Sequence, residues 1–112
     1  MWRTYVQVNY PVPDQQLMGM DKSIDDEIVN VAKTQGFDAD GAGTGFGLRD
    51  LDFSRVGKRR ASAIRVARNT YRILSERFPN DDDVMVSAYI HDDEETLTAD
   101  DDEETTIDID WS

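Results

Sequence analysis

The side chains that could do chemistry in this sequence are almost all carboxylates. The chain holds 24 Asp and Glu, 12 Lys and Arg, a single histidine, His91, and no cysteine. Without cysteine it has no thiolate nucleophile, no disulfide and no cysteine-ligated zinc or iron–sulfur centre. His91 follows an expected strand, and the sequence identifies no nucleophile or substrate pocket beside it that a general base would serve. We therefore expect a non-enzymatic protein with no catalytic residue, no metal and no cofactor.

The negative charge is concentrated at the C-terminal end of the chain. Residues 1–80 contain 12 Lys and Arg and 10 Asp and Glu, whereas residues 81–112 contain 14 Asp and Glu and no Lys or Arg. The first part therefore has a net charge of +2 and the second part −14, which together give the −12 of the whole chain. Charge localised in this way produces a directed electrostatic field.

Closely spaced carboxylates can take the place of nucleic-acid phosphates. The densest row runs from Asp100 to Glu104, and it can occupy the basic groove of a nuclease, a polymerase or a nucleic-acid-guided complex. The alternative is a solubilising tail with no specific partner. The residues expected to bind a partner are Asp81, Asp82, Asp83, Asp92, Asp93, Glu94, Glu95, Asp100, Asp101, Asp102, Glu103, Glu104, Asp108, Asp110 and Trp111.

Two further patterns have a plainer explanation than the chemistry they suggest. Asp50 and Asp52 lie two apart on an expected strand, so their carboxylates share one face, where oxygen ligands would suit Mg²⁺ or Ca²⁺. No third ligand is identifiable, and a solvated strand face explains the pair more simply. The glycines between 41 and 47 lack the Lys-Ser or Lys-Thr of a phosphate-binding loop and precede a strand rather than a helix. They favour the connection of a β-hairpin.

Hydrophobic periodicity indicates four strands and two helices. Alternating residues predict strands, and apolar residues three and four apart predict helices. Ser23 is typical of a helix N-cap, Asp25 suits the positive end of the helix dipole, and Gly36 suits the residue after a helix. The expected elements are a strand over 2–10, a helix over 23–35, a strand from 37 into the glycine cluster, a strand over 49–53, a helix over 58–78 and a strand over 84–90.

The order of these elements predicts a ferredoxin-like α+β fold, β-α-β-β-α-β. In that fold a four-stranded antiparallel sheet has both helices on one face. We expect this domain to span residues 1–91 and an acidic C-terminal extension to span 92–112. Alternation returns over 105–111, which either adds a fifth strand to the sheet or pairs with the sheet edge of a partner. The periodicity does not distinguish these alternatives.

The second helix is expected to have an apolar and a basic face. The expected core residues are Ile64, Ala67, Tyr71, Leu74 and Phe78, and the basic contact stripe on the other side is Lys58, Arg65, Arg68 and Arg72. Three interpretations of this stripe are open. It is an ordinary solvated helix face, it contacts nucleic-acid phosphates, or it binds the acidic extension of the same chain. Direct nucleic-acid binding conflicts with the extension, because a dense negative segment repels a polyanion.

In size, expected fold and charge, the chain resembles the small, acidic, cysteine-free inhibitors of phages and mobile elements, including anti-CRISPR proteins and DNA mimics. The resemblance is carried by Asp81-Asp82-Asp83, by Asp92 to Glu95 and by Asp100 to Glu104. It implies stoichiometric inhibition of a protein with a basic groove, such as a nuclease or a CRISPR effector, in the cytoplasm of a bacterial or archaeal host. It implies no membrane and no direct nucleic-acid contact. The basic helix departs from a mimic that is acidic all over.

Two other functions share these features. An immunity protein or antitoxin would use the same negative charge against a toxin nuclease. An RNA-binding ferredoxin-like domain would use Arg65, Arg68 and Arg72, with the acidic tail as an autoinhibitor.

Overall fold

The computed structural model describes residues 2–11, 23–45, 47–92 and 104–109. The elements in these ranges are β1 (Trp2–Pro11), α1 (Ser23–Thr34), β2 (Asp38–Gly45), β3 (Leu48–Val56), α2 (Arg60–Arg77), β4 (Met85–Asp92) and β5 (Glu104–Thr106). The predicted order of the first six elements is confirmed, and β5 follows them. Neither described helix has both the length and the hydrophobicity needed to cross a membrane.

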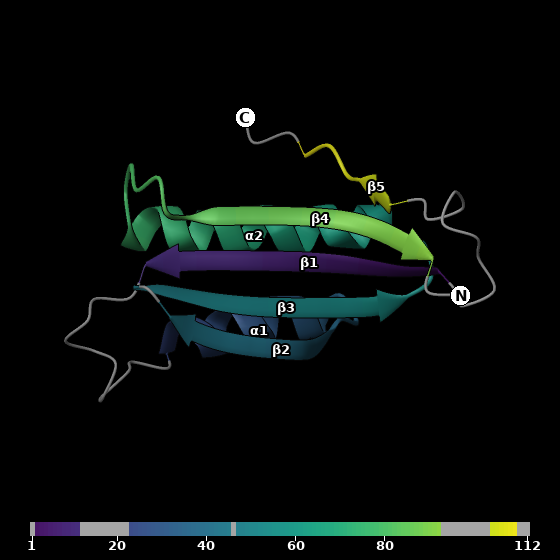
Figure 1. Ribbon diagram of the computed structural model, residues 1–112, viewed down its shortest axis with the longest axis horizontal. Coiled ribbons are helices and arrows are strands. Elements are labelled where there is room, and N and C mark those ends of the chain that lie inside the picture. The colour runs from purple at the N-terminus through teal and green to yellow at the C-terminus, as the bar shows by residue number, and fades with distance from the viewer. Residues whose placement is uncertain (1, 12–22, 46, 93–103, 110–112) are drawn as a thin grey trace.

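The strands form one antiparallel sheet in the order β2-β3-β1-β4-β5. β1 is the central strand, with β3 hydrogen-bonded on one side and β4 on the other. Both α1 and α2 lie behind the same face of the sheet and leave the opposite face without a helix (Figure 1). The predicted ferredoxin-like α+β fold is therefore confirmed, with β5 as an added edge strand.

The alternation predicted along β1 determines which of its side chains enter the core. Thr4, Val6 and Val8 are fully buried on the helix side, and Tyr10 is 2% exposed there. They meet buried apolar residues of both helices and of β3 and β4. The core consists of Val6, Val8, Tyr10, Ile28, Ala32, Phe37, Leu51, Phe53, Ala63, Val66, Leu74, Ala88, Ile90 and Ile107.

The end of α1 follows the sequence signal at Gly36. Gly36 has a φ of +77°, a conformation that glycine adopts without strain. The chain then reverses, and the Phe37 N–H donates to the Ala32 carbonyl at 3.0 Å. Phe37 is thereby inserted into the core, where it is 1% exposed. A side chain at Gly36 would also meet the Arg55 guanidinium at 3.0 Å.

The buried face of α2 differs from the prediction. Its buried residues are Ala63, Val66, Ala67, Thr70 and Leu74. The expected core residues Ile64 and Phe78 are half-buried, and Tyr71 is 38% exposed. Both sets repeat at helical spacing and share Ala67 and Leu74, so periodicity does not separate two faces about one residue apart. The smaller set lies inward because small side chains let the helix pack closely on the sheet.

Lys58 lies outside α2, whereas the prediction placed it on the helix. Its Nζ is 4.2 Å from the centre of the Trp2 ring, a cation–π contact with the start of β1. Thr4 joins the same two parts of the chain. Its hydroxyl accepts a hydrogen bond from the Arg59 N–H at 2.8 Å and donates one to the Gly57 carbonyl at 2.7 Å.

The glycine cluster belongs to an edge strand and not only to a connection. Gly41, Gly43 and Gly45 lie within β2, and the positive φ in the cluster, +77°, is that of Gly47 in the turn before β3. A side chain at Gly43 or Gly45 would meet nothing within 4 Å. Neither the backbone conformation nor close packing within the described chain therefore requires glycine at these two positions.

The segment after the acidic run forms part of the fold. β5 pairs with β4 at the edge of the sheet opposite β2. The Ile107 N–H donates to the Ala88 carbonyl at 2.9 Å, and the Ile107 side chain is 3% exposed. Ile109 packs against the same core. Of the two alternatives for 105–111, the chain's own sheet is the one observed, over Glu104–Thr106.

A buried polar cluster joins β1, α1 and β3. The Tyr10 hydroxyl donates to one oxygen of Asp25, and Arg49 donates to the other from Nε at 3.1 Å and from Nη2 at 2.8 Å. The Asp25 side chain is 11% exposed and that of Arg49 16%. Burial, together with the hydrogen bond to Asp25, raises the pKa of the Tyr10 phenol. Asp25 therefore does more than face the helix dipole, because it fixes α1 to two strands.

Replacing Asp25 by Ala should lower the free energy of unfolding by about 3 kcal/mol, because Arg49 would remain largely buried without its counter-charge. Asp26→Ala is the matched control, since Asp26 is exposed in the same helical turn. Urea unfolding of both variants measures the difference. Equal losses in the two variants would show that the helix dipole, and not the buried cluster, is responsible.

Replacing Ile107 by Ala should lower the free energy of unfolding by roughly 3 kcal/mol, the typical effect of a large-to-small change in a core. Asp108→Ala, at the exposed neighbouring position, should leave it nearly unchanged. Thermal unfolding followed by circular dichroism compares the two. No loss with Ile107→Ala would mean that the segment after β5 is not seated on the core in solution.

Candidate functional site

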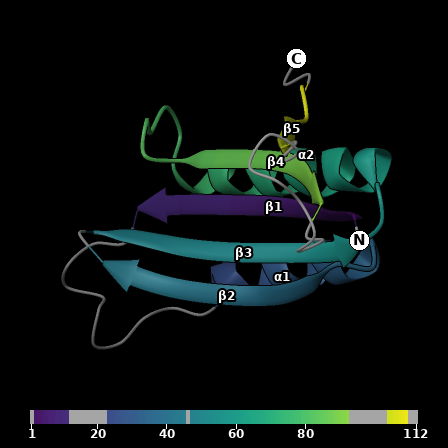
Figure 2. The same cartoon turned by 45° about the vertical axis from the view of Figure 1, so that its right-hand side comes forward.

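The candidate site is the face of the sheet that no described helix covers (Figure 2). Because side chains alternate along a strand, β1 sends one set into the core and the other set to this face. Residues directly opposite each other in an antiparallel pair point the same way, so the register gathers polar and aromatic side chains of β1, β3 and β4 there. We define the acidic open face as Tyr5, Tyr89, Asp40, Asp50 and Asp52.

Two tyrosines form the aromatic part of the acidic open face. Tyr5 of β1 and Tyr89 of β4 are directly opposite in the register. Their ring centres are 4.9 Å apart and their planes differ by 14°, so the rings are stacked. Each ring is half-buried, which leaves part of a flat aromatic surface at the centre of the sheet.

Asp52 is the least exposed of the three carboxylates. With Tyr5, Tyr89 and Asp40 it lines a hollow of about 240 Å³. Burial raises the pKa of Asp52, and the charges of Asp50 and Asp40 raise it further. All three causes act in the same direction. Holding these carboxylates together in the ionised state therefore opposes folding.

Asp50 extends this set of carboxylates toward the start of β3. It is exposed and lines a second hollow, of about 250 Å³, with Gln7, Asn9 and Asp52. No described Lys or Arg forms an ion pair with Asp50, Asp52 or Asp40. These three carboxylates therefore have no ion-pair partner among the described residues.

The alternative of a divalent metal at Asp50 and Asp52 gains no support from the geometry. Across the described ranges, no group of three His, Asp or Glu side chains is placed to hold a metal ion. The two carboxylates do share one face of β3, as the sequence predicts. Gly41 and Gly43 of β2 are their opposite partners on the edge side. This edge of the acidic open face is consequently free of side chains at both positions.

The basic residues of α2 lie in the other layer of the molecule. Arg65, Arg68 and Arg72 are exposed on α2, and α2 packs behind the sheet (Figure 1). Lys58, which the sequence grouped with them, is instead held over the Trp2 ring. The basic stripe and the acidic open face are thus on opposite sides of the fold.

Asp81, Asp82 and Asp83 form the loop between α2 and β4. The Asp81 carboxylate accepts the Asp83 N–H at 2.9 Å, which stabilises the turn, and Asp82 and Asp83 are exposed. β4 begins at Met85 opposite Asn9, and Asn9 is also opposite Asp50. The acidic loop therefore lies at the same end of the sheet as Asp50.

The other predicted acidic contact residues are described only in part. Asp92 ends β4, Glu104 begins β5, and Asp108 is exposed after β5. His91 of β4 is half-buried and is opposite Arg3 of β1 and Glu104 of β5. The predicted residues that lie outside the described ranges are Asp93, Glu94, Glu95, Asp100, Asp101, Asp102, Glu103, Asp110 and Trp111.

Sequence reasoning identified two of the five residues of this site. It singled out Asp50 and Asp52 on one face, but it did not include Tyr5, Tyr89 or Asp40. Both tyrosines alternate outward on their predicted strands, and that signal was present in the sequence. Their meeting depends on β4 pairing with β1, which periodicity alone does not establish.

The acidic open face has to be interpreted from its own geometry. No protein-family model, curated protein or solved structure matches this chain. Its geometry offers carboxylate acceptors beside flat aromatic rings, a combination that binds guanidinium and ammonium groups.

Replacing Asp52 by Asn should raise the free energy of unfolding at pH 7. The pKa of Asp52 is raised in the folded protein. Its protonation therefore favours folding in full below the ordinary carboxyl pKa of about 4, and this contribution to stability is lost as the pH rises through the folded-state pKa. The gain should therefore disappear near pH 3. Urea unfolding at the two pH values measures it, with exposed Asp83→Asn as control. An equal gain at both pH values would rule out a charge effect.

Proposed function

We propose that the protein is a non-enzymatic inhibitor of a nucleic-acid-handling defence complex, with an acidic surface that competes with DNA or RNA for a basic groove. The observation that carries the proposal is the grouping of Asp40, Asp50 and Asp52 on the helix-free face, without a described cation to neutralise them. No described helix covers this side of the sheet (Figure 2).

The chemistry of the acidic open face suits the groove of a nucleic-acid-binding protein. Such grooves present Arg and Lys to phosphates, and Arg binds a carboxylate in the same bidentate geometry. The stacked rings of Tyr5 and Tyr89 offer a flat surface for guanidinium groups, which stack on aromatic faces. Carboxylates would thus take the place of phosphates and the tyrosine rings the place of bases.

The environment of Asp52 supports the proposal. Its environment disfavours its charged form, and a neutral side chain in the same place would make the fold more stable. Proteins keep such locally unfavourable groups where function requires them. A cationic partner would reverse the effect, because an opposite charge favours the ionised carboxylate.

The C-terminal part of the sequence adds long-range attraction. Residues 81–112 carry 14 acidic residues and no Lys or Arg. A field of one sign speeds the encounter with an oppositely charged partner, and this effect weakens with salt. An immunity protein or antitoxin against a toxin nuclease would have the same surface, and the identity of the inhibited enzyme distinguishes the two.

RNA binding is the second candidate, because aromatic residues on the open sheet of small α+β domains stack on RNA bases. Tyr5 and Tyr89 occupy such a place on β1 and β4. The carboxylates around them oppose it, because a polyanion needs cations near its phosphates. The basic residues of α2 are on the opposite side of the fold and supply no cations for phosphates at this face.

The test is competition with labelled nucleic acid on purified CRISPR effector complexes and nucleases. Fluorescence anisotropy of a labelled duplex should show displacement by the chain at about 50 mM salt and much less at about 200 mM. A face variant, Asp40→Asn/Asp50→Asn/Asp52→Asn, should compete roughly tenfold less well. The matched control removes three exposed charges on the helices, Asp26→Asn/Glu27→Gln/Glu76→Gln, and should compete as the wild type does.

A tail variant tests the C-terminal charge separately. In it Asp100, Asp101 and Asp102 become Asn, and Glu103 and Glu104 become Gln. Undiminished competition by both the face variant and the tail variant would contradict the proposal. Direct binding of the labelled duplex or of labelled RNA by the wild-type chain alone would also contradict the proposal. Binding of the RNA would favour the RNA-binding candidate.

A further inference from the structure

We propose that the outer edge of β2 accepts an extended segment of a partner protein as an additional strand, and that this segment alternates apolar and basic side chains. The inference goes beyond the proposed function, because it holds for any partner that carries such a segment. Three features of the described chain carry it: an open strand edge, an apolar groove on one side of that edge and carboxylates on the other.

The edge of β2 is long and uncovered by any described strand. β2 is the terminal strand of the sheet and spans Asp38–Gly45, eight residues that are almost all exposed. Alternate residues of an edge strand direct N–H and C=O groups away from the sheet. Edges are commonly protected by Lys or Pro, and β2 contains neither. Its bulge lies between Ala39 and Gly41, so the edge from residue 41 onward is regular.

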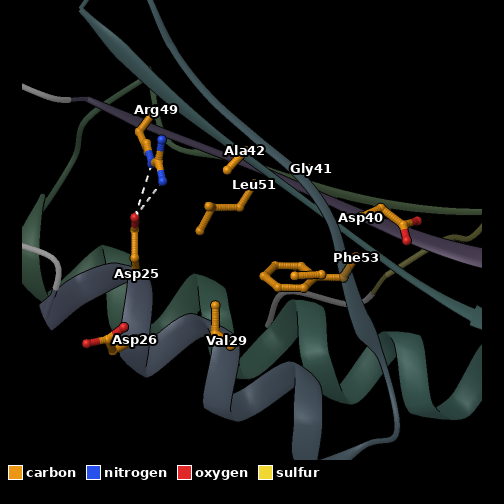
Figure 3. Close-up of a pocket in the computed structure, with 10 residues that line it drawn as sticks. Asp25, Asp26, Val29, Asp40, Gly41, Ala42, Arg49, Leu51 and Phe53 are labelled. Carbon is orange, nitrogen blue, oxygen red and sulfur yellow. Dashed lines mark hydrogen bonds and ion pairs between the residues drawn. The ribbon is translucent and has the colours of Figure 1, made fainter.

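A groove lies between this edge and α1. It has a cavity volume of about 420 Å³, and its apolar lining includes Leu51 and Phe53 of β3 and Val29 of α1. Figure 3 shows Leu51 and Phe53 pointing from the sheet toward α1. β2 contributes only the small side chains of Ala39 and Ala42 here. The groove exists because an edge strand without large side chains leaves this part of the helix–sheet layer unfilled.

The Asp25–Arg49 ion pair closes one end of the groove (Figure 3). Both of these groups are already satisfied by each other and by Tyr10. The charge that a ligand could still meet near that end is the exposed carboxylate of Asp26, which also lines the groove. Leu51 and Phe53 form the floor of the groove and are almost fully buried, so its accessible apolar surface is that of Val29, Ala39 and Ala42.

The other side of the same edge is acidic. Gly41 is opposite Asp52, and Gly43 is opposite Asp50. A Cβ at Gly41 would lie 3.7 Å from the Asp52 carboxylate, and one at Gly43 would meet nothing. Glycine within a strand often marks a close approach by a ligand or another backbone. Here the glycines leave the path from the edge to both carboxylates open, and the Asp40 side chain points away from the groove (Figure 3).

These two environments specify the partner segment. In an added strand successive side chains point to opposite faces. One set would enter the apolar groove, and the other would cross the glycines toward Asp40, Asp50 and Asp52. Charge complementarity requires the second set to be basic. A second copy of this chain fits poorly, because its own β2 carries no Lys or Arg and each chain has a net charge of −12.

The test uses an eight-residue peptide, the length of β2, in which valine and arginine alternate. Titration calorimetry measures its affinity, and amide NMR shifts map its position. The expected result is binding with shifts concentrated in β2 and in the α1 residues of the groove. A peptide with the same valines and arginines in two separate blocks should bind about tenfold more weakly, because only the alternating order satisfies both faces.

Ala42→Leu fills the groove from β2 and should weaken the alternating peptide about tenfold while leaving the fold intact. Ala61→Leu makes the same change at an exposed site on α2 and should have no effect. Equal affinity for the two peptides, or shifts on the helix layer instead of β2, would overturn the proposal. Self-association that Ala42→Leu abolishes would overturn it in favour of a second copy. Failure of the nucleic-acid competition leaves this result unaffected, so the two proposals fail separately.

Discussion

The central position of β1 is the constraint on which the rest of the molecule depends. β1 is hydrogen-bonded along both sides, and its side chains alternate strictly between the core and the helix-free face. A register shift of one residue would exchange these two sets. Val6 and Val8 would then face solvent, and Tyr5 would enter the core. The same alternation that buries the apolar residues therefore creates the acidic open face, and the fold and the candidate site have one physical origin.

The two edges of the sheet differ in how far they are covered by other described elements. On the β4 side, β5 covers the edge over Tyr89, Ile90 and His91, and Ile107 completes the core. On the β3 side, β2 remains uncovered among the described residues, and its composition of glycine and alanine leaves both a groove and an open path to the carboxylates. The buried cluster of Asp25, Tyr10 and Arg49 holds α1 in place beside that groove. A sheet with one covered edge and one open edge is suited to pairing on a single side.

The charge distribution combines an unfavourable local arrangement with a long-range field. Burial raises the pKa of Asp52, and the neighbouring carboxylates Asp50 and Asp40 raise it further. The acidic C-terminal part of the chain contributes the greater share of the net charge. The first effect acts over a few ångströms, and in the function we propose it would select a cation at a defined place. The second acts over about a Debye length, roughly 10 Å at moderate salt, and increases the rate of encounter. The basic residues of α2 lie in the other layer and do not cancel either effect.

The sequence by itself determined the alternation of β1, the end of α1 at Gly36, the order of the elements and the ferredoxin-like fold, because these depend on local periodicity and on capping residues. It also placed Asp50 and Asp52 on one face. Only the tertiary structure decided which side of α2 is buried, since two overlapping apolar sets satisfy the helical period. Strand order brought Tyr89 beside Tyr5, and the packing of α1 on the sheet joined Asp25 to Arg49. Neither contact has a signature in the spacing of residues along the chain. The glycines of β2 resembled a connection because their composition favours turns, and pairing with β3 made them an edge strand.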